Sequence, residues 1–147
     1  MTGISDILGF NFVVIGPTLT LLATALILLF VTITISTPTF VKKYVTLFGI
    51  LSTVFAVFLK FGLFLSDGVS SYFSEKILLD EFALVGNVLI VLVLLFTFNS
   101  FWKTSSQISN KTTEALILIL MSASGFLLMV DSENFIMLFI GLEIGSI

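Results

Sequence analysis

The 147-residue sequence contains no cysteine, no histidine and no arginine. Without cysteine the chain forms no disulfides and offers no thiolates for iron-sulfur clusters, and without histidine it lacks the usual zinc sites and histidine-ligated haem. We therefore expect no cofactor and no metal site in this chain. If the protein serves redox biology, the electrons move through other subunits.

Charged residues are also scarce, at 10% of the sequence, and the net charge is -3. A nucleic-acid-binding protein needs a clustered basic face, so we expect no nucleic acid partner. Hydrophobic residues make up 58% of the chain and the mean hydropathy is +1.24, which leaves too few polar side chains to cover a water-soluble globule. The composition therefore predicts an integral membrane protein whose surface contacts lipids.

Apolar runs divide the chain into helices separated by short polar connectors. Runs of about twenty apolar residues are long enough to cross a bilayer as helices. We therefore predict an all-α membrane protein forming one bundle over residues 1–147. Its five transmembrane helices are expected at about 12–35, 44–65, 82–101, 114–130 and 134–147.

Lysines concentrate in two of the four connectors. Lys42 and Lys43 fall between the first two helices, and Lys103 and Lys111 fall between the third and the fourth. The other two connectors are mainly acidic, with Lys76 as their one lysine. By the positive-inside rule, the lysine-bearing connectors face the cytoplasm or the matrix and the amino terminus faces the opposite side.

The last apolar run contains one acid, Glu143. As a helix the run would place Glu143 roughly 13 Å beyond Asn134, near the middle of a hydrocarbon layer about 30 Å thick. An ionisable side chain at that depth is costly unless it faces protein or water, so we interpret Glu143 as a functional residue. A lysine that approaches or leaves it would switch its affinity for a proton, which suggests proton transfer.

Gly141 and Gly145 lie four residues apart in the same run and therefore share one helix face. This pattern allows the backbone of a neighbouring helix to approach closely. At about 100° per residue, Glu143 points roughly the opposite way, on the face that it shares with Ile136 and Phe139 and with Ile140. We therefore expect this helix to be enclosed on both sides, inside a larger bundle.

The fifth run is short for a membrane span, at about 20 Å from residue 135 to residue 147. A helix that stopped there would leave its last carbonyl groups unpaired in lipid. We expect a companion chain to continue the bundle, and the alternative is that the sequence is an incomplete gene product.

Three segments resemble the N-type antiporter-like membrane subunits of respiratory complex I, the NADH dehydrogenase subunit 2 family. They are L-L-D-E-F-A at 78–83, S-A-S-G-F-L-L-M at 122–129 and S-E-N-F-I-M-L-F-I-G-L-E-I-G-S-I at 132–147. The most specific piece is F-I-G-L-E-I at 139–144, which is similar to the Gly-x-Glu segment in the fifth helix of the family. Outside residues 79–146 the resemblance is mainly one of hydropathy and helix count.

This resemblance implies that the chain is the amino-terminal part of an antiporter-like bundle. Glu143 would pair with a lysine on a seventh helix, in a proton channel completed by a companion chain carrying the remaining helices. The other membrane subunits of complex I would be further partners, in a proton-translocating NADH:ubiquinone oxidoreductase. The location would be the mitochondrial inner membrane, with the bacterial plasma membrane as the alternative.

Other interpretations remain open. Glu143 could be a structural acid, the chain a structural remnant without a proton role, or the protein a subunit of a multi-subunit cation/proton antiporter. Lys60 lies about 8 Å inside the predicted second helix, where we expect it to snorkel to the interface rather than transfer protons. We interpret Asp131 and the neighbouring connector acids as solvated loop residues.

Overall fold

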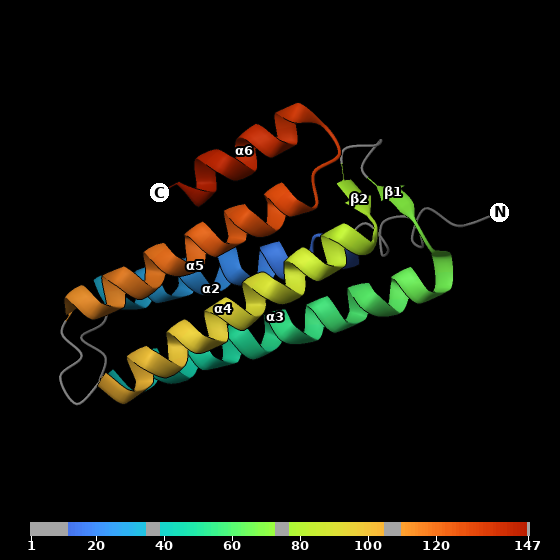
Figure 1. Ribbon diagram of the computed structural model, residues 1–147. Helices are drawn as coiled ribbons and strands as arrows, with labels where there is room; N and C mark the ends of the chain where they lie inside the picture. The colour runs from blue at the N-terminus through green and yellow to red at the C-terminus, as the bar shows by residue number, and fades with distance from the viewer. Residues whose placement is uncertain (1–11, 35–38, 73–76, 105–109, 147) are drawn as a thin grey trace.

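Four long helices form an antiparallel bundle, and a shorter fifth helix lies along one side of it (Figure 1). The computed structural model describes residues 12–34, 39–72, 77–104 and 110–146. The helices are α2 (Gly16–Thr34), α3 (Thr39–Asp67), α4 (Glu81–Thr104), α5 (Asn110–Val130) and α6 (Phe135–Gly145), and the strands are β1 (Ser70–Tyr72) and β2 (Ile77–Leu79).

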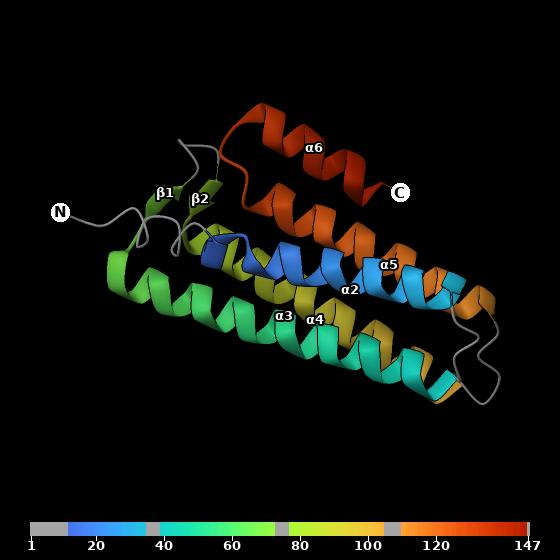
Figure 2. The ribbon, with the colours of Figure 1, turned by 180° about the vertical axis from the view of Figure 1, so that it is seen from behind.

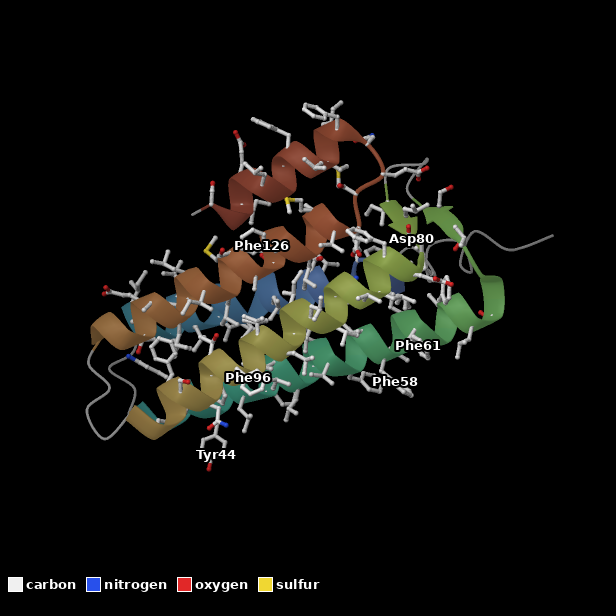
Figure 3. All side chains as sticks on the ribbon, in the orientation of Figure 1. Tyr44, Phe58, Phe61, Asp80, Phe96 and Phe126 are labelled. Atoms are coloured by element: carbon white, nitrogen blue, oxygen red, sulfur yellow. The ribbon has the colours of Figure 1, made fainter. Side chains whose placement is uncertain are left out.

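The four long helices, α2 to α5, are each long and apolar enough to cross a membrane, and α6 is a shorter apolar helix. Large aromatic side chains cover the outside of the bundle: Phe58, Phe61 and Phe96 are exposed and point away from it (Figure 3). In water such a surface would be strongly unfavourable, whereas lipid tails accept it. The predicted all-α membrane fold is confirmed.

The core lies where α2, α3, α4 and α5 meet. Helix α2 packs against both α3 and α5, as the view from behind shows (Figure 2). Leu21 and Leu28 of α2 are fully buried in this core, together with Leu120 and Leu127 of α5. Between α2 and α3 the hydroxyl groups of Thr20 and Thr53 lie 3.0 Å apart in a hydrogen bond.

A short antiparallel hairpin connects α3 to α4, where the sequence predicted only a connector. Strand β1 pairs with β2, with Ser70 opposite Leu79. The chain turns out of α3 at Gly68, whose φ of 69° is the left-handed conformation that glycine adopts without strain. Leu79 is fully buried, so the hairpin covers one end of the bundle, which we call the hairpin end.

Helix α3 extends beyond its predicted limits in both directions, beginning at Thr39 instead of residue 44 and ending at Asp67 instead of residue 65. Lys42 consequently lies within the helix and is buried, not in a loop. The first eleven residues and residues 73–76, including Lys76, lie outside the described residues. The orientation in the membrane therefore stays a prediction.

Helix α6 packs chiefly on α5, through the glycine face that the sequence predicted. Gly141 and Gly145 are buried there against Gly125 of α5. The Ser122 hydroxyl of α5 donates a 2.5 Å hydrogen bond to the carbonyl of Gly145. At the other end of α6 the side chain of Asn134 accepts a hydrogen bond from Met137 N, which satisfies one of the free N–H groups at the helix start. These contacts hold α6 antiparallel to α5 (Figure 1).

Candidate functional site

Glu143 lies on the exposed side of α6, opposite the buried glycines. Its neighbours on that side are also uncovered: the exposed fractions are 69% for Ile136, 51% for Phe139 and 39% for Ile140. The predicted division of α6 into a close-packing face and an acid-bearing face is confirmed. Among the described residues, α5 covers the glycine face, and the face that carries Glu143 is left uncovered.

Among the described residues, no ion pair involves the Glu143 carboxylate. The hydrogen bond found at this residue uses its backbone carbonyl, which accepts from the hydroxyl of Ser146 at 2.9 Å. A lysine partner for Glu143 therefore has to come from outside the described contacts, and the role of Glu143 stays a prediction.

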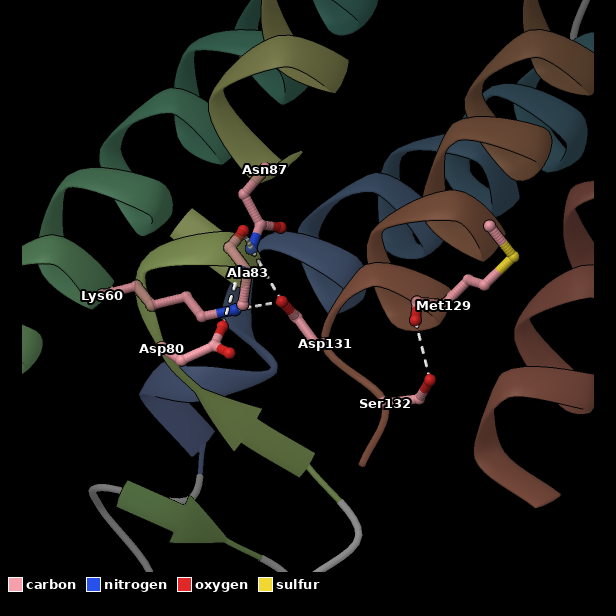
Figure 4. Close-up of polar contacts among 7 residues, drawn as sticks. All are labelled: Lys60, Asp80, Ala83, Asn87, Met129, Asp131 and Ser132. Atoms are coloured by element: carbon pink, nitrogen blue, oxygen red, sulfur yellow. Dashed lines mark hydrogen bonds and ion pairs between the residues drawn. The ribbon is translucent and has the colours of Figure 1, made fainter. Parts of the chain in front are cut away.

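The structure reveals a second polar site, at the hairpin end of the bundle. The Lys60 ammonium lies 2.6 Å from Oδ1 of Asp131, and the two side chains are 0% and 2% exposed (Figure 4). The interpretation of Lys60 as a snorkelling residue is wrong, because its side chain points into the bundle toward an acid. The interpretation of Asp131 as a solvated loop acid is also wrong, because the α5–α6 junction lies under the hairpin.

Asn87 of α4 completes this cluster. Its Nδ2 group donates to Oδ1 of Asp131 at 2.7 Å and to the carbonyl of Ala83 at 2.7 Å. Both neighbours of Nδ2 are acceptor oxygens, which fixes the orientation of the amide. In the flipped orientation, Asn87 Oδ1 would face the oxygens of Asp131 and Ala83. Asn87 Oδ1 is left buried without a hydrogen-bond partner, and the Lys60 ammonium makes no further hydrogen bond. The cluster is therefore enclosed by protein, and its side chains use only part of their hydrogen-bonding capacity with one another.

Two further contacts tie the cluster to the hairpin end. Asp80 precedes α4 and its Oδ1 accepts a 2.7 Å hydrogen bond from Ala83 N, as an N-terminal cap does. Figure 4 shows its carboxylate beside the Lys60 side chain. The backbone carbonyl of Asp131 accepts from Leu78 N of β2 at 2.9 Å. The junction between α5 and α6 is thus held by α3, α4 and the hairpin together.

Burial raises the pKa of the Asp131 carboxyl above its usual range, and the nearby Lys60 charge and Asn87 amide oppose that rise. A carboxyl in a dry site favours its protonated form, whereas a cation and a donor favour the ionised form. Asp131 is therefore placed between two opposing effects, which makes its protonation sensitive to the position of Lys60.

One sequence signal could have revealed this cluster. Lys60 lies about 8 Å before the predicted end of its helix at residue 65, and Asn87 lies about 8 Å after the predicted start of the next helix at residue 82. Because the two helices are antiparallel, both polar side chains reach the same depth from the same side. Asp131, at the end of the predicted fourth helix, comes from that side as well.

Comparison with known proteins gives one informative match. The chain is 30% identical over 95 residues to NADH-quinone oxidoreductase subunit N of Campylobacter concisus (strain 13826). The match covers 64% of this chain and 19% of that protein, so the chain spans well under two thirds of the relative's length. No protein-family model matches the chain, and no solved structure matches it. The resemblance found in the sequence is confirmed at this level: the chain is similar to an NADH-quinone oxidoreductase subunit N over 95 residues.

Proposed function

We propose that this protein is a membrane-arm subunit of a proton-pumping NADH:quinone oxidoreductase and that Glu143 transfers protons in it. The observation that carries the proposal is the division of α6, whose glycine face is packed on α5 while its acid-bearing face is uncovered. An ionisable residue on a membrane helix faces protein or water rather than lipid. The similarity to a subunit N supports the assignment to this enzyme.

The covering element for the Glu143 face would be a further helix that carries a lysine. It would belong either to a companion chain or to a continuation of the same subunit, and the other membrane subunits of the complex would be further partners. A lysine on that helix could form an ion pair with Glu143 and separate from it again when the helix moves. A bistable ion pair of this kind can take a proton from one side of the membrane and release it to the other.

The proposed location is a respiratory membrane, either the mitochondrial inner membrane or a bacterial plasma membrane. The end of the bundle that carries Lys42 and Lys43 of α3, Lys103 of α4 and Lys111 of α5 would face the matrix or the cytoplasm, and the amino terminus would face the intermembrane space or the periplasm. In that orientation α6 begins on the outer side and runs inward, so Glu143 lies farther from the outer surface than the cluster at the hairpin end does.

Replacing Glu143 by glutamine tests this function. We expect the Glu143→Gln variant to assemble normally and to lose most of the proton pumping that depends on this subunit, because glutamine keeps the shape but cannot carry the proton. Pumping and NADH oxidation are measured together in vesicles reconstituted with the purified complex. The matched control is Glu133→Gln, an exposed acid between α5 and α6, which should leave pumping unchanged.

The same preparation separates the alternatives. Normal pumping by assembled Glu143→Gln complex would contradict the proton role. Loss of assembly together with pumping would instead indicate a structural acid. Flavin and iron-sulfur subunits should copurify with the chain, and their absence from an active preparation would support a cation/proton antiporter.

A further inference from the structure

We propose that Lys60, Asp131 and Asn87 form a proton-binding site that is separate from Glu143 and opens toward the hairpin end of the bundle past Asp80. The site lies at the junction of α3, α4 and the α5–α6 turn (Figure 4). It does not depend on the role proposed for Glu143, because no described contact joins the two sites.

The unused hydrogen-bonding capacity of the cluster is the first argument. A buried ion pair is stabilised only when its remaining donors and acceptors are also satisfied. Here the Lys60 ammonium has one close partner, and Asn87 Oδ1 has none. Both donors approach a single oxygen of Asp131, its Oδ1. The free-energy gap between the ionised and the protonated carboxyl is therefore narrower than in a fully satisfied pair.

The site takes up and releases one proton, at the Asp131 carboxylate. In the unloaded state Lys60 is an ammonium and Asp131 is a carboxylate. One proton from water forms an O–H bond at the Asp131 carboxylate, which becomes a neutral acid, while Lys60 keeps its three N–H bonds. The loaded cluster carries one positive charge more, and releasing the proton restores the ion pair.

Asp80 supplies the countercharge for this loaded state. Asp80 is only partly buried, whereas Lys60 and Asp131 are enclosed, so it is the charged neighbour of the cluster that water can reach. The other charged groups near the cluster are exposed: Glu81 lies on α4 and Glu133 in the α5–α6 turn, while α2 and β2 contain no Asp, Glu, Lys or Arg. A carboxylate beside the cluster stabilises the extra positive charge and offers a route from water.

In the opposite direction, no hydrogen bond among the described residues leads from the cluster along α3 into the bundle. The next buried polar side chain along this face of α3 is Thr53, about 10 Å away along the helix, which exceeds a hydrogen bond several-fold. Its hydroxyl donates to the carbonyl of Gly49 in its own helix. Leu21 and Leu127 belong to the buried apolar core beyond it. We therefore assign proton exchange at this site to the hairpin end, where Asp80 lies beside Lys60.

Infrared difference spectroscopy on the full chain, purified within its membrane assembly, tests the proposal. Lowering the pH should produce the C=O stretching band of a protonated carboxyl in a dry site, shifted in heavy water. The band should be missing in Asp131→Asn and present in Glu143→Gln. Identical pH-difference spectra for the wild-type protein and folded Asp131→Asn would overturn the proposal, whatever the pumping assay shows for Glu143.

A second variant keeps the test informative if Asp131→Asn does not fold. Asp80→Asn retains the cap on Ala83 N but removes the countercharge. The band should then appear at a pH lower by about one unit, because the loaded state loses its stabilising neighbour. Glu81→Gln, which removes an exposed acid next in the sequence, should cause no shift. Equal midpoints for Asp80→Asn and wild type would contradict the proposed site.

Discussion

Replacing Lys60 by methionine is expected to destabilise the bundle by about 3–5 kcal/mol, the usual cost of removing one partner from a buried ion pair. Methionine fills a similar volume, so lost packing contributes little. The loss arises because Asp131 stays enclosed at 2% side-chain exposure with Asn87 as its remaining side-chain donor. We expect Asp131→Leu to be similarly costly, since it leaves the lysine unpaired.

The double variant Lys60→Met with Asp131→Leu is the control for this experiment. With both charges gone, the Asn87 amide is the one member of this cluster with unpaired polar atoms, and we expect most of the stability to return. Unfolding of the reconstituted protein in mixed micelles, followed by circular dichroism, measures all four forms of the cycle. Single variants as stable as the wild type, or a double variant as unstable as the two losses combined, would show that the pair contributes no coupling.

Replacing Gly125 by alanine should weaken the attachment of α6 to α5. A Cβ atom at this position would lie 2.7 Å from the carbonyl oxygen of Gly141 and 2.7 Å from Cα of Gly145. Both contacts are with backbone atoms, so no side-chain rotation relieves them and the helices have to separate. Overpacking of this kind costs about 1–3 kcal/mol.

Gly62→Ala is the matched control, because it is also a helix glycine but has no atom within 4 Å of the added Cβ. Alanine favours helix over glycine by roughly 1 kcal/mol, so Gly62→Ala should be neutral or stabilising. We therefore expect Gly125→Ala to lower the stability of the protein and Gly62→Ala to keep or raise it, although both replace glycine by alanine.

Cross-linking reads out the position of α6 directly. The sequence has no cysteine, so a pair introduced as Ser122→Cys and Ser146→Cys would be unique. The Ser122 hydroxyl donates to the carbonyl of Gly145, the residue before Ser146, so positions 122 and 146 lie close together where α6 packs on α5. Oxidation should link them rapidly in the parent and slowly with Gly125→Ala, and equal rates would contradict close packing at Gly125.

The helices could be predicted from sequence because hydropathy is a local property. Each long apolar run had to become a spanning helix, since lipid satisfies no backbone hydrogen bonds. The two faces of α6 followed from helical periodicity at Gly141, Gly145 and Glu143. The hairpin was missed because its strands are three residues long, and the buried Ile77 and Leu79 stand among the polar residues of a connector.

The predicted helix limits indicate that Lys60 and Asp131 lie at a similar depth, but they do not show that the two side chains form an ion pair. The two residues are about 70 positions apart, and each alone fits an ordinary interfacial residue. What distinguishes them is the packing of α3 against α4 and the cover that the hairpin gives to the α5–α6 turn. These are tertiary properties, so the pattern within any one helix does not encode them.

The distance in sequence between Lys60 and Asp131 also affects how the protein is synthesised and inserted. At about 5–20 residues per second, the ribosome delivers Asp131 roughly 4 to 14 s after Lys60. During that interval α3 carries Lys60 without its ion-pair partner, and the nearest available acid is Asp80. We expect the nascent helix to hold the ammonium near the membrane surface until the α5–α6 turn is made. The ion pair can form only after Asp131 is made, and it then links α3 to the end of α5 at the hairpin end of the bundle.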